Sequence, residues 1–319
     1  MNPIFLARRL LTLLLTLFVA SLLIFGVLEL LPGNAAQVLM GPDAAPEAVA
    51  ALTEKLGLND AAITRYFHWL SGMLRGDLGE SYAYGSPVAT LIAERLALTV
   101  PLALLSMALA ALLALVAGVF AASRHNRLGD WLVSALSQLG IALPNFWFAI
   151  LLILVFSVGL QWVPAGGFPG WSEGMVPALQ ALALPAVSLA VVQAAILARV
   201  TRGAVLEQLH EDYVRTARAK GLSRRGALWG HVLRNAMVPV TTVMGLQFAN
   251  LLAGTIVIEN VFYLPGLGRL IFQAIANRDL TVVRDCVMLL AAMVVAVNFV
   301  VDLLAAWIDP RLQQQGAGA

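Results

Sequence analysis

The sequence predicts an all-α, polytopic membrane protein with six transmembrane helices, and three observations lead to this fold class. Hydrophobic residues make up 60% of the 319 residues and charged residues only 12%, whereas a soluble domain carries about 25% charged residues. The mean hydropathy is +0.85. Six apolar runs are each long enough to cross a bilayer about 30 Å thick at about 1.5 Å of helix rise per residue. A soluble domain is therefore excluded.

The first apolar run, residues 10–31, follows Arg8 and Arg9. A secretory signal peptide also begins with positive charge, but its apolar core is only about 7 to 15 residues long and ends at a small-residue cleavage site. Here the run is longer, and Leu-Pro-Gly-Asn at 31–34 follows it. We expect residues 1–31 to form the N-terminus and a retained first transmembrane helix.

The other five apolar runs form the predicted membrane core, residues 96–308, with the coupling loop discussed below at 201–236 and a tail at 309–319. Pro144 interrupts the third run. Because proline removes a backbone donor and clashes with the preceding turn, we expect a kink there. The five runs are residues 96–122, 132–160, 177–200, 237–258 and 286–308.

Residues 32–95 are the one long polar segment, and two amphipathic helices can be read within it. The first begins at Pro46 and ends at Gly57, and the second is capped by Asn59 or Asp60. Helical spacing of apolar residues supports both. We expect this segment to pack on the membrane surface or on the spans. The apolar positions are Val49, Leu52, Leu56, Ile63, Tyr66, Phe67, Leu70, Met73 and Leu74.

The distribution of Lys and Arg predicts the orientation. With six spans both termini share a side, and 13 of the 20 basic residues fall on that side. The positive-inside rule therefore places both termini and the loop at 212–221 in the cytoplasm, and residues 32–95 outside. The 13 residues are Arg8, Arg9, Arg124, Arg127, Arg199, Arg202, Arg215, Arg218, Lys220, Arg224, Arg225, Arg234 and Arg311.

The sequence offers little for an enzyme. A nucleotide-hydrolysing subunit needs Gly-x-x-x-x-Gly-Lys-Ser/Thr, but the two lysines, Lys55 and Lys220, follow Glu54 and Ala219. If ATP drives this protein, another subunit must hydrolyse it. The single Cys286 is interpreted as a small apolar residue, and no cofactor or metal site is expected. The histidines are far apart and outside the spans, at His68, His125, His210 and His231.

Polar residues inside spans are few. Of the ionisable ones, Glu29 and Asp302 lie near span ends, so each is expected to reach the interface rather than to relay protons. Uncharged polar residues could line a hydrated path for a polar solute. Hydrogen bonds between helices are an equally good explanation for each of them. The candidates for a path are Asn145, Gln193, Gln247 and Asn250.

The segment from Asp212 to Gly221 contrasts with the apolar chain around it. Glu211 and Asp212 suit a helix N-terminus, and Arg218 and Lys220 suit the opposite end. Gly221 can adopt the left-handed conformation that ends a helix. Ser223 can then cap a second helical piece that reaches Asn235. A solvated loop between two spans is the alternative interpretation.

This segment resembles the EAA-type loop of ABC importer permeases, in the form found in the dipeptide and oligopeptide subfamily. The resemblance rests on Asp-Tyr-Val-Arg-Thr-Ala-Arg-Ala-Lys-Gly-Leu-Ser at 212–223 and His-Val-Leu-Arg-Asn-Ala-Met-Val-Pro at 231–239. The EAA triplet itself falls on residues 215–217, where only Ala217 matches the generic motif.

Further blocks resemble the same subfamily, in its order, along the whole chain. Two positions depart from its pattern: Asn34, where an aspartate is usual, and Arg284. These departures concern substrate identity more than class. The blocks are Leu31–Asn34, Gly76–Ser81, Pro144–Phe146, Phe262–Arg269, Ala274–Ile275, Arg278–Asp279 and Asp309–Arg311.

The resemblance implies a six-helix permease of type I importer fold in the bacterial inner membrane. It implies a second, related permease, two cytoplasmic ATPases, a periplasmic solute-binding protein, and a peptide or small polar solute as cargo. The loop at 212–221 would be the coupling helix. We expect Tyr213, Ala217 and Gly221 to contact the ATPase, and Glu211, Asp212, Arg218 and Lys220 to form the charged rim of this contact.

Alternatives remain open from the sequence. An ion-coupled secondary transporter or channel acting without an ATPase is the second functional hypothesis, and uptake by the purified chain with an ion gradient alone would favour it. Contact with membrane lipid is an alternative side role for the basic cluster, whereas nucleic acid is not an expected partner. Dipeptides, oligopeptides, glutathione and nickel chelates are all carried by proteins of the subfamily that the chain resembles.

Overall fold

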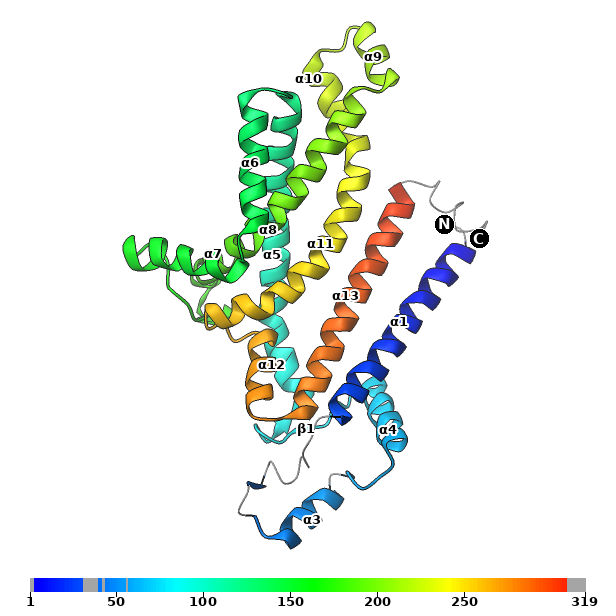
Figure 1. Cartoon of the computed structure of the whole chain (residues 1–319), viewed down its shortest axis with the longest axis vertical. Coiled ribbons are helices and arrows are strands. Elements are labelled where there is room, and N and C mark those ends of the chain that lie inside the picture. Colours follow the sequence, from blue (N-terminus) through cyan, green and yellow to red (C-terminus); the bar gives the residue numbers. More distant parts are fainter. Residues whose placement is uncertain (1–2, 31–39, 42–43, 56, 309–319) are drawn as a thin grey trace. The chain divides into compact units, whose positions relative to one another are not determined.

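The computed structural model describes residues 3–30, 40–41, 44–55 and 57–308, and most of them are helical (Figure 1). The chain forms two compact units. The first unit comprises Met1–Leu10, Val100–Leu264 and Ala296–Ala319, and the second comprises Leu11–Thr99 and Pro265–Val295. The predicted blocks Leu31–Asn34 and Asp309–Arg311 lie outside the described residues.

Five helical stretches in the described residues are long and apolar enough to cross a membrane, and a bent pair of helices adds a sixth if it counts as one span. The all-α, polytopic fold class is thus confirmed. The helices reach beyond the apolar runs because polar residues continue them; α5, for example, begins before Leu96. The five are α1 (Pro3–Glu29), α5 (Val88–Ser123), α8 (Met175–Leu209), Arg224–Val261 and α13 (Leu280–Ile308).

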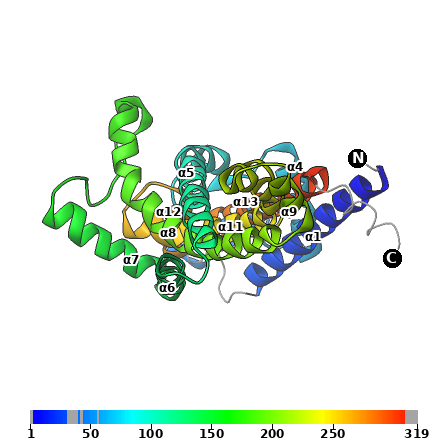
Figure 2. The ribbon, with the colours of Figure 1, turned by 90° about the horizontal axis from the view of Figure 1, so that it is seen from above.

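The predicted kink at Pro144 is in fact a break. Helix α6 (Leu128–Ala142) ends before it, and α7 (Asn145–Leu152) continues into a π-helical turn, Ile153–Gly159, at an angle of 104° to α6. Leu143 has extended backbone angles, φ −83° and ψ 127°, because a residue before proline is disfavoured in the α region. Figure 2 shows α6 nearly end-on while α7 runs across the view.

Helix α8 is the centre of the first unit and packs against α6, α7 and α11 (Leu233–Val261). It also approaches α5 closely at Gly118. A Cβ added to Gly118 would lie 2.6 Å from the Thr201 Cβ and 2.8 Å from the Ala198 carbonyl oxygen. The absence of a side chain at this position is therefore what lets α5 and α8 lie in backbone contact.

Replacing Gly118 by alanine should separate α5 from α8, because its methyl group would meet a backbone oxygen that cannot rotate away. Overpacking of this kind costs about 1–3 kcal/mol. We expect a lower thermal unfolding midpoint for Gly118→Ala, measured by tryptophan fluorescence in detergent. Gly203→Ala on α8 is the matched control, because its Cβ would meet nothing within 4 Å. An equal effect of both variants would contradict the packing described here.

The second unit has an aromatic and an aliphatic core. On α4 (Ala62–Arg75), Tyr66 and Trp69 are buried, and the Phe25 ring of α1 lies 5.4 Å and 6.0 Å from their ring centroids. The Tyr66 hydroxyl lies 2.8 Å from that of Ser21. The aliphatic core joins the start of α5 to α12 (Leu267–Ala276) and the start of α13. Of the apolar face predicted for α4, Tyr66, Leu70 and Met73 pack against residues of α1 and α13, whereas Ile63, Phe67 and Leu74 are exposed.

The polar segment contains both expected helices, α3 (Pro46–Lys55) and α4. It also contains a short antiparallel pair of two-residue strands, β1 (Glu80–Ser81) and β2 (Ser86–Pro87), which the sequence did not predict. The predicted cap of α4 was wrong. Ala61 occupies the cap position and no side chain caps the helix. Asp60 instead donates its backbone N–H to the Gly57 carbonyl, which places it in the preceding turn.

Both acidic residues predicted near span ends form ion pairs. Glu29 pairs with Arg65 of α4 in the second unit. In the first unit, the Asp302 Oδ2 lies 2.9 Å from the Arg9 Nη1. All four side chains remain about a quarter to two-fifths exposed, so each pair contributes little free energy.

Candidate functional site

The α9 loop, residues 210–223, is built by local sequence signals. Helix α9 (Asp212–Ala219) has Asp212 in its first turn and Arg218 in its last, which matches the helix dipole. Gly221 has a φ of +96°, as its predicted left-handed conformation requires. The Ser223 hydroxyl accepts a hydrogen bond of 3.1 Å from the Gly226 N–H, so the predicted cap is confirmed.

The sequence predicted that the helix capped by Ser223 reaches Asn235, but the helix continues beyond this residue. Helix α10 (Arg224–Ala227) passes into a π-helical turn, Leu228–Val232, and then directly into α11. The backbone is thus helical from Arg224 to Val261. Any force on the α9 loop therefore reaches a transmembrane helix without an intervening hinge loop.

The inner face of α9 is packed against the bundle. Val214 is buried in a hydrophobic cluster with Val119 of α5, Val205 of α8 and Val232. Tyr213 packs against the same cluster, and its hydroxyl donates a hydrogen bond of 2.8 Å to the Gln208 Oε1. Part of the Tyr213 side chain is therefore already in contact with other residues of the permease.

The outer face of α9 is open. Ala217 is half-buried and Gly221 is exposed. Asp212 and Arg215 form an ion pair of 3.2 Å, but their side chains are 93% and 74% exposed, so this pair contributes little stability. A partner could approach this face closely because Ala217 and Gly221 carry small side groups or none. The remaining predicted rim residues, Glu211, Arg218 and Lys220, are also exposed.

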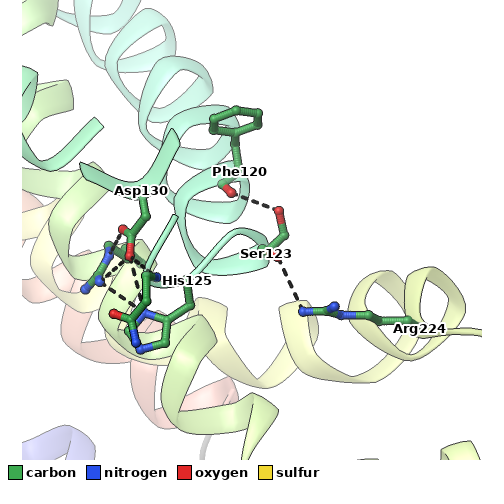
Figure 3. A network of polar contacts seen from close by, with 7 residues as sticks. Phe120, Ser123, His125, Asp130 and Arg224 are labelled. Carbon is green, nitrogen blue, oxygen red and sulfur yellow. Dashed lines mark hydrogen bonds and ion pairs between the residues drawn. The ribbon is translucent and has the colours of Figure 1, made fainter. Parts of the chain in front are cut away.

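An ion pair next to the α9 loop ties the α5–α6 turn to α8, as Figure 3 shows. Asp130 is 4% exposed, and its Oδ1 and Oδ2 lie 2.5 Å and 2.8 Å from the Nε and Nη2 of Arg202. Oδ2 also accepts a 3.0 Å hydrogen bond from the Asn126 N–H and lies 3.3 Å from the His125 Nδ1. Both carboxylate oxygens are thus satisfied, in the bidentate geometry that makes such pairs strong.

A second contact joins α10 to the same turn. The Arg224 Nη2 donates a 3.3 Å hydrogen bond to the Ser123 carbonyl oxygen at the end of α5 (Figure 3). The Ser123 hydroxyl in turn donates to the Phe120 carbonyl at 2.8 Å. The α5–α6 turn is therefore held on one side by α8 and on the other by α10, and the α9 loop connects these two supports.

Sequence reasoning did not identify Asp130 or Arg202 as partners, since they are 72 residues apart. One signal was present. Asp130 lies in the first turn of an apolar helix, where a carboxylate needs a cationic partner if it is buried. The predicted span began at residue 132, which left Asp130 out of the list of intramembrane acids.

The four candidate path residues lie in the first unit but do not form one cluster. Gln193 on α8 is 4% exposed, and its Oε1 has no hydrogen-bond partner among the described residues. Asn145 lies at the start of α7, where its Nδ2 would be 3.4 Å from a Cβ added to Gly254 of α11. On α11, the Asn250 Nδ2 donates a 3.3 Å hydrogen bond to the Gln247 Oε1.

Comparison with known families decides the class of this chain. The family model described as the binding-protein-dependent transport system inner membrane component matches residues 114–314, and the model of its N-terminal part matches residues 3–103. The chain belongs to this family. It is therefore a permease component of an ABC transport system and a multi-pass protein of the inner membrane.

Individual relatives cover nearly the whole permease. A probable peptide ABC transporter permease of Sinorhizobium fredii is 38% identical over 97% of this chain and 99% of its own length. A putative peptide transport system permease of Brucella abortus is 41% identical over 93% and 95%. The glutathione transport system permease of Escherichia coli K12 is 40% identical over 96% and 97%.

A solved structure supports the fold. The crystal structure of an amino acid ABC transporter with histidines matches with a TM-score of 0.50 and 16% identity, over 70% of this chain and 94% of that one. At this identity the similarity concerns the fold alone. Permeases of this family act in general with an ATPase, a solute-binding protein and a second permease.

Breaking the Asp130–Arg202 pair should destabilise the permease. Asp130→Asn leaves the Arg202 guanidinium near a neutral amide; since about a quarter of Arg202 is exposed, we expect a loss of about 1–3 kcal/mol rather than that of a fully buried pair. A double-mutant cycle with Arg202→Gln, followed by thermal unfolding, should give a coupling energy of at least about 1 kcal/mol.

The exposed pair on α9 is the matched control for this cycle. Asp212→Asn with Arg215→Gln should give a coupling energy below about 0.5 kcal/mol. Equal coupling energies for the two pairs would show that the Asp130 pair does not hold the α5–α6 turn.

Proposed function

We propose that this permease is a subunit of an ATP-driven importer for dipeptides, oligopeptides or similar solutes, and that α9 is the helix on which the ATPase acts. Relatives named as peptide and glutathione permeases support the class of solute. Separate ATPase subunits would supply hydrolysis, because the two lysines of the chain do not belong to a phosphate-binding Gly-Lys motif. A second, related permease and a periplasmic binding protein would complete the complex.

One observation carries the assignment of α9. This helix is exposed on its outer face, is fixed on its inner face by buried Val214, and is joined by the short turn at residues 220–223 to the continuous helix Arg224–Val261. A partner that binds the outer face and moves α9 would therefore displace α8 and α11 together. We assign Ala217 and Gly221 to the centre of the contact and Glu211, Asp212, Arg218 and Lys220 to its rim, with Tyr213 at its base.

The α9 loop would transmit nucleotide binding as a rigid-body movement. ATP-driven approach of two ATPases would displace α9, and the Asp130–Arg202 pair would carry the displacement to the α5–α6 turn. The bundle would then exchange between inward-open and outward-open arrangements. On this proposal Asn145, Gln193, Gln247 and Asn250 face the solute in at least one of these arrangements.

A charge introduced at the centre of α9 should uncouple the transporter. Ala217→Arg would place a long cation at the half-buried position 217, in the centre of the proposed contact, and so prevent close approach of the ATPase. We expect uptake of trialanine by proteoliposomes containing the complete transporter to fall at least about 10-fold, while basal ATP hydrolysis persists. Ala219→Arg carries the same charge two residues further along the helix and should retain coupling. Full uptake by Ala217→Arg would contradict the assignment of α9.

Gly221→Pro tests the turn that ends α9. Proline fixes φ near −65°, whereas Gly221 has a φ of +96° and donates its N–H to the Arg218 carbonyl at 3.0 Å. The altered turn should misplace α9 and abolish coupled uptake while the bundle still inserts, as membrane yield and thermal unfolding would show. Normal coupling in this variant would mean that the position of α9 does not matter.

The proposed orientation places both termini and α9 in the cytoplasm. Cys286 is fully buried, so a maleimide reagent should label it little, and the labelling of a single added cysteine can be measured. We expect a membrane-impermeant maleimide to label Ala62→Cys in cells whose outer membrane is permeabilised, and to label Thr216→Cys only after the inner membrane is opened. The reverse pattern would contradict the orientation.

A further inference from the structure

The second unit contains a pocket of about 480 Å³. Its walls come from the end of α1, from α4, from residues 77–82 and from the start of α13. Ligand pockets are typically about 300–1,000 Å³, so this one can hold a solute of the size of a short peptide. On the proposed orientation the pocket opens on the periplasmic side of the membrane.

Trp69 forms a fixed surface in this pocket. Its side chain is 6% exposed, and its indole Nε1 donates a hydrogen bond of 2.6 Å to the Asp285 Oδ1. The ring of Phe25 stacks on it at a centroid distance of 6.0 Å. Because both contacts come from transmembrane helices, the indole has little freedom to move.

Arg284 places a cation on this surface. Its guanidinium lies 4.8 Å from the centroid of the Trp69 ring, and its Nε lies 3.4 Å from the Asp285 Oδ1. Within the described residues the two terminal amino groups of Arg284 donate no hydrogen bond, and the side chain is 23% exposed. A guanidinium fixed by stacking, with both terminal amino groups unused, suits a carboxylate that binds it bidentately.

Carboxylates at the rim of the pocket provide the opposite charge. Asp60 and Glu80 line it, are exposed, and form no ion pair among the described residues. Glu29 and Arg65, which also line it, are already paired with each other. Although the Arg284 guanidinium is paired with Asp285 through its Nε, its two terminal amino groups remain unused in the described part of the pocket, and two carboxylates that are unpaired there lie at the edge, an arrangement that complements a zwitterion.

We propose that this pocket binds a short zwitterionic peptide, with its C-terminal carboxylate on Arg284 and its ammonium group at Asp60 and Glu80. The inference rests on the proposed function and deepens it, because it gives the permease its own binding site for cargo besides that of the binding protein. Arg284 is one of the positions at which the sequence departs from the subfamily pattern, so the site is a property of this chain.

Equilibrium binding of radiolabelled trialanine tests the site directly. The complete transporter would be used in lipid nanodiscs, without binding protein and without ATP. Trialanine amide and N-acetyl-trialanine, each lacking one terminal charge, compete for the site. Hydrogen bonds to charged groups are strong enough that each modified peptide should bind about 10-fold to 100-fold more weakly than trialanine. This comparison needs no mutation, so it is independent of any effect on folding.

Arg284→Gln then identifies the group that the carboxylate contacts. The variant should bind trialanine about 10-fold to 100-fold more weakly but trialanine amide with the same affinity as the unmutated chain. A merely structural role of Arg284 would weaken both peptides by the same factor. Arg75→Gln is the matched control, because Arg75 is an exposed arginine of α4 outside the pocket lining, and it should change neither affinity.

Three results would overturn the site: no measurable binding of trialanine, equal binding of trialanine and its amide, or an equal loss of both peptides in Arg284→Gln. Uptake of trialanine by the complete transporter with its binding protein separates this failure from failure of the proposed function. Uptake without specific binding would leave peptides as cargo and reject only the pocket. Absence of uptake for every peptide tested would reject the proposed function itself.

Discussion

The bidentate pair between Asp130 and Arg202 is the contact on which the geometry of the α9 loop depends. The Asp130 carboxylate is only 4% exposed, so α6 and α8 must stay close enough for the guanidinium to satisfy it. The missing side chain at Gly118 permits this approach by letting α5 touch α8. The pair joins α6 to α8 and the glycine lets α5 contact α8, and together they fix the end of the bundle that carries α9.

This arrangement explains how a helix of eight residues can act as a rigid body. Isolated helices of this length are unstable in water, and α9 gains its stability from Val214 in the bundle and from the turns at its two ends. Its outer face contributes almost nothing to folding, since the side chains there are exposed. A surface without a structural role, held on a rigid support, is free to serve as a contact for another subunit.

Much of the fold and part of the site could be predicted from the sequence, because the signals are local. Apolar runs gave the spans, and the conformations of Gly221 and Ser223 followed from residue type alone. The break at Pro144 was predicted in place but not in size, because its 104° angle depends on what α7 packs against. Contacts between distant residues were missed: Asp130 with Arg202, and Trp69 with Asp285, are 72 and 216 residues apart. The prediction that Asp60 caps α4 was wrong because Asp60 belongs to the preceding turn, in which its N–H donates to the Gly57 carbonyl.

Site-specific photocrosslinking tests the central claim, that a separate ATPase grips the outer face of α9. A photoreactive phenylalanine derivative would replace Ala217 in the complete transporter, with the same residue at Ala62 of α4 as the control. The account predicts an adduct with the ATPase subunit from position 217 that changes in yield when ATP binds, and no such adduct from position 62. If the variant with the photoreactive residue at position 217 still hydrolyses ATP and takes up peptide but forms no adduct with the ATPase, the account is contradicted.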